Sequence, residues 1–217
     1  MTTATEVYGL GLGGDRVWLE GSRVGELPVR DWTSDHLEGD LGLIGRCHGP
    51  TIDLGCGPGR LAAALLARHV LALGVDISKE AVALASARGA AVLQRDVFGL
   101  LPREGGWHHA LLADGNIGMG GDPIRLLLRC RELLTPTGTV LLDLQGTGAH
   151  LRTDRVRLLA GDLASDWFAW SSLPTGALPA IAEATGFSVR GVWRSAGRWQ
   201  AELQPSDDGD GARDATR

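Results

Sequence analysis

Asp53-Leu54-Gly55-Cys56-Gly57-Pro58-Gly59 is the segment of this 217-residue sequence that decides the fold. The apolar run Thr51–Leu54 leads into it, and the alanine- and leucine-rich run Arg60–His69 follows it. These runs predict a buried strand and a helix on either side of a glycine-rich turn. Glycines at such a junction let the backbone turn tightly and approach a ligand that a Cβ atom would exclude. The segment therefore predicts a binding loop at the carboxyl end of a strand.

Predicted strands and helices alternate along the chain around this loop. The strands are Thr51–Leu54, Val70–Val75, Ala91–Leu93, Ala110–Ala113 and Thr139–Leu144, and the helices are Arg60–His69, Lys79–Arg88 and Asp122–Leu134. Such alternation predicts a mostly parallel sheet that is covered on both faces. Further on, Leu178–Thr185 is a predicted helix, and Phe187–Arg194 with Arg198–Leu203 is a predicted β-hairpin.

The two ends of the chain differ from this pattern. Val17–Val29 mixes short apolar runs with glycine and proline, which predicts an irregular arm or a hairpin. Thr33-Ser34-Asp35 predicts the cap of a helix that runs to about Cys47. We therefore divide the chain into an N-terminal arm (1–32), one α/β domain (33–204) and a tail (205–217) whose Asp, Gly and Ser content predicts disorder.

The spacing of the glycines distinguishes two kinds of nucleotide-binding loop. The sequence has Gly-x-Gly-x-Gly, whereas a dinucleotide fingerprint has its third glycine one residue later, where this chain has Arg60. The carboxylate of Asp53 at the strand end would repel a pyrophosphate but suits a ligand with an ammonium group. These features argue against an NAD-dependent oxidoreductase, which we keep as a less favoured alternative.

Two more carboxylates follow at predicted strand ends. Asp76 comes 23 residues after Asp53, where an acid can accept hydrogen bonds from both ribose hydroxyls in nucleotide-binding α/β folds. Asp96 follows the third strand and would accept a hydrogen bond from an adenine amino group. Either acid alone would as readily be a helix-cap or turn residue, but three acids in this order favour a nucleoside-containing cofactor.

In this order, Asp53–Gly59, Asp76 and Asp96 resemble the cofactor motifs of class I S-adenosylmethionine (SAM)-dependent methyltransferases. The resemblance covers residues 30 to 145, approximately. It implies an α/β, Rossmann-like sheet of seven strands in the order 3-2-1-4-5-7-6, with the last strand antiparallel and helices on both faces. It also implies SAM as the cofactor. By resemblance, Gly55, Gly57 and Gly59 line the methionine part, Asp76 holds the ribose, and Asp96 with Val97 frames the adenine. Asp53, Cys56 and Ile77 are further cofactor-binding candidates.

A second glycine-dense loop, 113–122, follows the fourth predicted strand. Asp114 or Asn116 would contact the SAM ammonium group or the acceptor, and we predict Asn116 as a catalytic residue. Some methyltransferases of amines have Asn-Pro-Pro-aromatic here, but this chain has Asn-Ile-Gly-Met, so an amine acceptor is not implied. The loop also resembles that of uncharacterised actinobacterial methyltransferase-like proteins. The alternative is a flexible connector that ends in a helix cap at Asp122.

The segment after the fifth strand is predicted to form the acceptor pocket, because ligands bind beyond the carboxyl ends of strands in such sheets. His150 is a candidate general base. Arg152 would bind a carboxylate or phosphate, and Trp167 and Trp170 would flank a ring or a cation. The alternative is that the arginine is solvated and that the tryptophans pack in the core.

Composition and charge indicate which kinds of binding partner this protein is expected to have. The formal net charge is −5 and no basic run stands out, so nucleic acid is not an expected partner. No apolar stretch is long enough to span a bilayer, and the cysteines at 47, 56 and 130 form neither a metal-ligand nor a disulfide pattern. We expect a cytoplasmic monomer or homodimer that methylates a small molecule. The main alternative is a catalytically inactive SAM-binding protein that acts as a sensor or structural partner.

Overall fold

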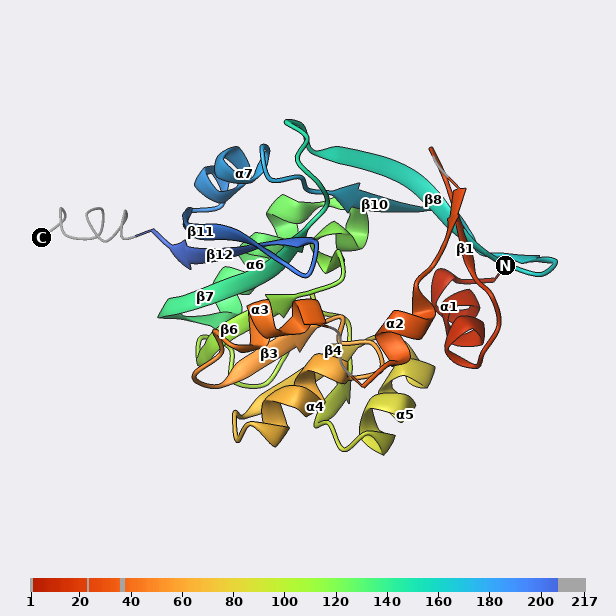
Figure 1. Cartoon of the computed structure of the whole chain (residues 1–217), viewed down its shortest axis with the longest axis horizontal. Coiled ribbons are helices and arrows are strands. Elements are labelled where there is room, and N and C mark those ends of the chain that lie inside the picture. Colours follow the sequence, from red (N-terminus) through yellow and green to blue (C-terminus); the bar gives the residue numbers. More distant parts are fainter. Residues whose placement is uncertain (1, 23, 36–37, 207–217) are drawn as a thin grey trace, which may run out of the picture.

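The computed structural model describes residues 2–22, 24–35 and 38–206. Within these residues the main sheet has seven strands, and β3, β4, β5, β6 and β7 are parallel whereas β12 is antiparallel to both of its neighbours. The order is β5 (Val92–Gln94), β4 (Ala72–Asp76), β3 (Thr51–Leu54), β6 (Trp107–Leu112), β7 (Leu134–Leu144), β12 (Arg198–Pro205) and β11 (Phe187–Ser195) (Figure 1). The predicted strand order and the antiparallel last strand are confirmed.

Both faces of this sheet are buried, as the alternation along β6 shows. Ala110 and Leu112 belong to the core cluster that includes residues of α6 and α7. Leu111 and the following Ala113 belong to a second cluster with residues of α3, α4 and α5. The helices around the sheet are α3 (Leu41–Ile44), α4 (Arg60–Ala67), α5 (Lys79–Ala87), α6 (Pro123–Leu133) and α7 (Leu178–Ala184).

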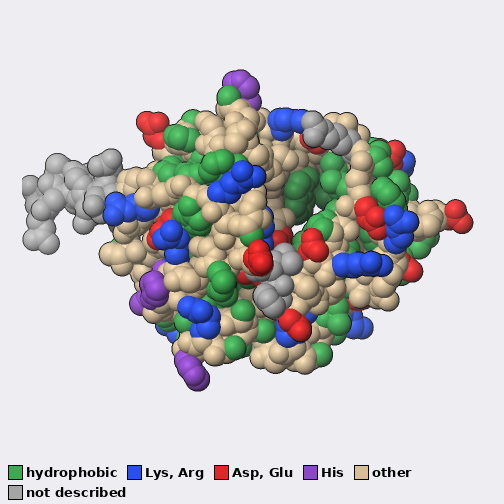
Figure 2. Space-filling model, viewed as in Figure 1, with side chains coloured by type: hydrophobic (Ala, Val, Ile, Leu, Met, Phe, Trp, Pro, Cys, Tyr) green, Lys and Arg blue, Asp and Glu red, His purple; other side chains and the backbone are tan. Residues whose placement is uncertain are grey.

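A second, antiparallel sheet joins the N-terminal arm to the segment after β7. Its order is β10 (Phe168–Ser172), β8 (Arg152–Ala160), β1 (Trp18–Glu20) and β2 (Val24–Glu26), with β9 (Leu163–Ala164) also paired to β8. Of the two alternatives predicted for residues 17–29, an irregular arm or a hairpin, the structure has the hairpin. The sequence analysis did not predict β8, β9 or β10. In Figure 1, β8 runs along the top of the molecule towards the arm. Figure 2 shows the surface hollowed beside β8, with hydrophobic side chains inside the hollow.

The N-terminal arm also contains a helix, α1 (Ala4–Leu12), which the sequence analysis did not predict. The Thr3 hydroxyl accepts a hydrogen bond from the Glu6 backbone N–H, and the Glu6 carboxylate accepts one from the Thr3 backbone N–H, so a capping box starts this helix. Val7 is fully buried and packs in a cluster with Val17 and Leu158. The arm therefore shares a small core with β8.

The predicted continuous helix from residue 35 to about Cys47 is wrong for the residues that the structure describes. A short helix, α2 (Val29–Thr33), ends before this segment, which forms only a 3-10 turn η1 (Glu38–Asp40) and the short α3; residues 36–37 lie outside the description. Glycines at 39, 42 and 45 weaken helix formation here. A Cβ at position 42 would also lie 2.0 Å from the Gln200 amide oxygen, so tertiary packing selects a glycine at this place.

Two further expectations concern the chain as a whole. The predicted disordered tail falls almost entirely on residues 207–217, which lie outside the described residues. Among the helices that the structure describes, none has the length and apolar character needed to cross a membrane.

We predict that Leu158→Ala will loosen the second sheet. Leu158 is 5% exposed in the small core that α1 shares with β8, and emptying such a site costs about 2–5 kcal/mol. Urea unfolding should show this loss. Leu159→Ala is the matched control, because the neighbouring side chain points to the other, partly exposed face of β8. Equal losses in the free energy of unfolding for the two variants would mean that the packing of α1 against β8 does not stabilise the protein.

Candidate cofactor and acceptor site

The glycine loop after β3 has a backbone conformation that few other residues adopt. Gly55 and Gly59 have φ values of +74° and +78°, in the left-handed region, and Gly59 is the N-cap of α4. A Cβ at position 59 would lie 2.6 Å from the Cβ of Ala85, so α5 also requires a glycine there. The loop thus turns sharply at the end of β3, and it has no side chains at Gly55, Gly57 and Gly59 that would keep a ligand from its backbone.

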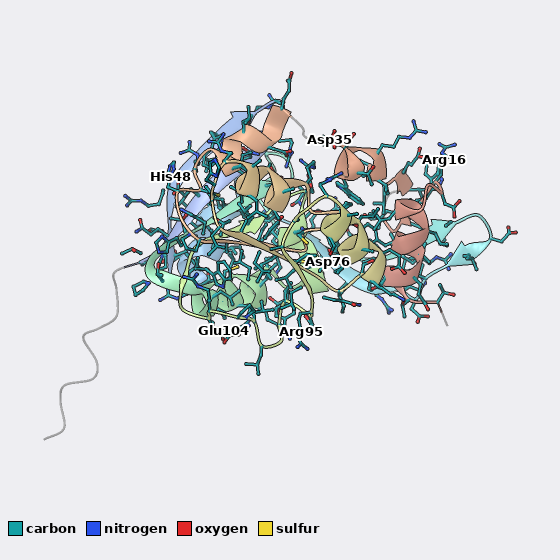
Figure 3. The ribbon with its side chains drawn as sticks, turned by 90° about the horizontal axis from the view of Figure 1, so that it is seen from below. Arg16, Asp35, His48, Asp76, Arg95 and Glu104 are labelled. Carbon is teal, nitrogen blue, oxygen red and sulfur yellow. The ribbon has the colours of Figure 1, made fainter. Side chains whose placement is uncertain are left out.

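Asp76, at the end of β4, holds this loop in place. Its carboxylate accepts hydrogen bonds from the backbone N–H groups of Gly57 and Ser78, each at 2.8 Å. Burial raises the pKa of Asp76 above its ordinary value, although these bonds oppose the rise. Each carboxylate oxygen keeps a free lone pair that can accept a hydroxyl hydrogen bond. In Figure 3 Asp76 lies in the interior of the molecule, whereas Arg95 lies at its edge.

Tyr8 of α1 covers the glycine loop, and the sequence analysis missed it. A Cβ at position 57 would lie 3.1 Å from the Tyr8 hydroxyl, and the Tyr8 ring meets the Trp32 ring edge-on at 5.8 Å between centroids. Burial and the Asp76 carboxylate raise the pKa of Tyr8, so its hydroxyl remains a hydrogen-bond donor. The Thr3/Glu6 capping box was the sequence signal that could have located this helix.

Asp96 and Val97, which were predicted to frame an adenine, follow β5. Asp96 accepts a hydrogen bond from the Phe98 backbone N–H at 2.9 Å and shapes the turn after β5. Val97 is buried, and its carbonyl accepts a hydrogen bond from the buried Arg129 side chain at 3.0 Å. Ile77 is 58% exposed, which leaves an apolar surface beside Asp76. Arg129 was not predicted, and it fixes this turn from α6.

Two other predicted cofactor residues lie inside the fold. Asp53 is 2% exposed, and burial, together with the nearby Asp114 carboxylate, raises the pKa of Asp53 to about 7. The Cys56 side chain packs towards β4, since a Cβ at Gly74 would lie 2.6 Å from its sulfur. Cys56 therefore contributes its backbone to the loop, and burial raises the pKa of its thiol, which favours the unreactive neutral form.

Asp114, after β6, is tied to arginines on both sides. Its carboxylate pairs with Arg60 at 2.6 Å and with Arg198 at 3.2 Å, and its backbone N–H donates to Asp143 at 2.7 Å. Its φ of +52° is unusual for a residue other than glycine, and these contacts hold it there. Because both carboxylate oxygens already have cationic partners, the predicted contact between Asp114 and the cofactor remains a prediction.

These contacts belong to a larger buried network. Arg60 also pairs with Asp40, and Arg198 pairs with both Asp40 and Asp143. Arg198 comes from the β11–β12 hairpin, so the network connects the end of the chain to the carboxyl ends of β6 and β7. A cavity of about 600 Å³ lies between the network and the hairpin tip. Pairs so distant in sequence leave no local signal, which explains why these arginines were missed.

Asn116 opens the 3-10 segment η2 (Asn116–Gly121) and braces the glycine loop. Its side-chain amide donates to the carbonyl oxygens of Leu54 at 3.1 Å and Gly55 at 2.7 Å. A Cβ at Gly55 would lie 3.0 Å from the Met119 sulfur, so η2 packs directly on the loop. The structure thus places Asn116 at the glycine loop, with its amide nitrogen occupied in positioning that loop. Its predicted catalytic role remains a prediction.

A second cavity, of about 470 Å³, lies between the arm, the segment after β7 and the β8–β10 ladder, and we call it the acceptor cavity. Three predicted residues line it together: His150, Arg152 and Trp170. The wall also includes Leu19 of the arm, which the sequence did not predict. A Cβ at Gly118 of η2 would lie 2.6 Å from the Trp170 indole nitrogen, so this ring connects the cavity to η2.

Trp167 is not beside Trp170, contrary to the prediction that the two rings act together. It is 43% exposed, and the Arg157 guanidinium lies 4.9 Å from its ring centroid. Trp167 is not among the described residues that line the acceptor cavity. The reason is the strand period of two, because residues three apart on an extended segment point to opposite faces.

Comparison with known proteins gives one family. Residues 52–138 match the family model described as a methyltransferase domain. No curated protein sequence matches the chain.

Solved structures share the fold over most of the chain. A SAM-dependent methyltransferase from Bacteroides fragilis, in complex with S-adenosyl-L-homocysteine (SAH), has a TM-score of 0.80 at 20% identity and covers 95% of this chain and 97% of its own. The 1,6-didemethyltoxoflavin-N1-methyltransferase of Burkholderia thailandensis has a TM-score of 0.62 at 18% identity, with 82% of each chain covered. A sugar N-methyltransferase from Streptoalloteichus sp. has a TM-score of 0.59 at 15% identity, with 78% of this chain and 87% of its own covered.

The family match spans the glycine loop, Asp76, Asp96 and Asn116, and of these acids and amides Asp76 and Asn116 bond directly to the loop. The structural match to the Bacteroides fragilis protein covers 95% of this chain and so extends the shared fold beyond residues 52–138. Residues 52–138 therefore resemble a methyltransferase domain, and the chain shares the Rossmann-like fold of solved SAM-dependent methyltransferases.

Proposed function

We propose that this protein is a SAM-dependent methyltransferase that transfers a methyl group to a small molecule. The observation that carries the proposal is the position of η2 between two sites. One side of η2 braces the glycine loop through Asn116, and the other side meets Trp170 in the acceptor cavity. A cofactor on the loop and an acceptor in the cavity would therefore lie beside the same turn, close enough to each other for direct transfer.

The residues at the loop fit SAM. Asp53 offers a carboxyl for the ammonium group, and Asp76 retains lone pairs for the ribose hydroxyls. Asp96, Val97 and Ile77 would frame the adenine. When bound, SAM supplies an electrophilic methyl group on a sulfonium. The chain's part is to hold an acceptor close to that methyl group and in line with it.

Support for a small acceptor comes from the acceptor cavity and from the matched structures. The volume of about 470 Å³ falls within the range of small-molecule sites. Two of the structural relatives are described as acting on 1,6-didemethyltoxoflavin and on a sugar. His150 is exposed on the cavity wall and would act as a general base where the acceptor must lose a proton.

We predict that the protein binds SAH and not NAD, which calorimetry can measure. Asp76→Ala should weaken SAH binding by about 1–3 kcal/mol, because it removes the ribose acceptor and one support of the loop. Asp162→Ala, on the exposed β8–β9 turn, is the matched control and should bind SAH as the parent does. Tighter binding of NAD than of SAH would favour the oxidoreductase alternative. Binding of SAH without methyl transfer to any acceptor in a cell extract would favour the inactive SAM-binding alternative.

We also predict that SAH affinity rises as the pH is raised from about 6 to about 8. Asp53 has a pKa of about 7, and only its ionised form attracts an ammonium group. Asp53→Asn should remove this pH dependence. A pH profile of calorimetric affinity that is the same in both proteins would assign the dependence to another group.

The same carboxyl should affect the stability of the ligand-free protein. The pKa of this carboxyl is higher in the folded protein than in the unfolded chain. The folded protein therefore loses stability as the pH rises from the unfolded-state pKa through the folded-state pKa of about 7. Asp53→Asn resembles the protonated form, so it should raise the melting temperature near pH 8, with a smaller gain near pH 5. A melting temperature of the variant below that of the parent near pH 8 would show that Asp53 is stabilised as an anion.

A further inference from the structure

One face of the β8–β10 ladder forms a wall of the acceptor cavity. Arg152, Asp154 and Val156 alternate along β8 and line the cavity together, with Trp170 directly opposite Asp154 on β10. The Arg152 side chain is 52% exposed, whereas Val156 is 5% exposed. The cavity therefore has a polar mouth and an apolar depth, which suits a ligand with one polar edge and one apolar face.

The charges at the mouth compensate each other. The Arg152 guanidinium lies 3.0 Å from the Asp154 carboxylate and donates to the Ser22 hydroxyl at 3.0 Å. Of the described residues that line the cavity, His150 is the one other ionisable group. An anion would compete with Asp154 for the guanidinium, and a cation would compete with Arg152 for the carboxylate. An uncharged molecule with its own donor and acceptor can bond to the remaining N–H groups and lone pairs without breaking the pair.

The aromatic part of the wall lies nearest to the cofactor loop. Trp170 meets the Phe168 ring edge-on at 6.3 Å between centroids and reaches Gly118 of η2. Asn116, in the same turn, bonds to the Gly55 carbonyl. A flat ring packed on the indole would thus lie beside η2, with its polar edge towards the mouth.

We infer that the acceptor cavity takes an uncharged, planar nitrogen heteroaromatic molecule of one or two fused rings. The ring packs against Trp170, and its C=O and N–H groups bond to Arg152 and Asp154. The inference rests on the proposed methyltransferase function and adds the class of acceptor. The volume of about 470 Å³ accommodates such a molecule.

Three fused-ring probes of similar size test the inference by calorimetry on the SAH-saturated protein. They are quinazolinedione, which is uncharged with N–H and C=O groups, naphthoate, which is an anion, and naphthylmethylamine, which is a cation. The parent protein should bind quinazolinedione about tenfold more tightly than either charged probe. Tighter binding of a charged probe, or binding of none of the three, would overturn the inference.

Substitutions at the wall separate stacking from charge. Trp170→Ala should weaken quinazolinedione binding about tenfold, Trp170→Phe should retain most of it, and Trp167→Ala should leave it unchanged. Asp154→Ala frees Arg152 and should strengthen naphthoate binding, whereas Arg152→Ala frees Asp154 and should strengthen naphthylmethylamine binding. Equal effects at Trp167 and Trp170, or unchanged preference in both charge variants, would count against the inference. Failure of the parent to bind SAH in the preceding titration would instead count against the proposed function.

Discussion

The site depends on one constraint: the glycine loop after β3 must stay in left-handed backbone conformations that an unsupported chain would leave. Asp76 holds it from β4 through the Gly57 N–H, and Asn116 holds it from η2 through the Gly55 carbonyl. Tyr8 covers it from α1. Each support comes from a different part of the chain, so the loop acquires its shape only when the parallel sheet, η2 and the N-terminal helix are assembled.

Buried charge is the second organising feature of the molecule. Arg60 and Arg198 compensate three carboxylates at the carboxyl end of the sheet, and this network attaches the C-terminal hairpin to β6 and β7. Asp53 lies nearby and titrates near neutral pH, because burial and Asp114 outweigh the attraction of Arg60. The ionised form of such a buried carboxyl destabilises the ligand-free protein, but it favours the binding of a cation.

The second sheet explains how one small domain could acquire an acceptor site. The segment after β7 leaves the main sheet, forms β8 and β10, and pairs with β1 of the N-terminal arm. The N-terminal arm and the segment after β7 are thereby joined in one sheet. Cross-strand register then decides which residues share the cavity wall, and it places Trp170 with Asp154 while Trp167 lies outside.

Apart from the strand order, which the family resemblance implied, the sequence by itself determined the alternating strands and helices of the main sheet and the positions of the glycine loop and the strand-end acids. These follow from local patterns: apolar runs, glycines that need left-handed φ, and acids at strand ends. Only the tertiary structure decided the roles of Tyr8, Arg60 and Arg198, the division between Trp167 and Trp170, and the break in the helix predicted to run to Cys47. Those outcomes depend on contacts between residues that are far apart in sequence, such as Arg198 with Asp40 or Gln200 against Gly42, and a local pattern carries no record of such a partner.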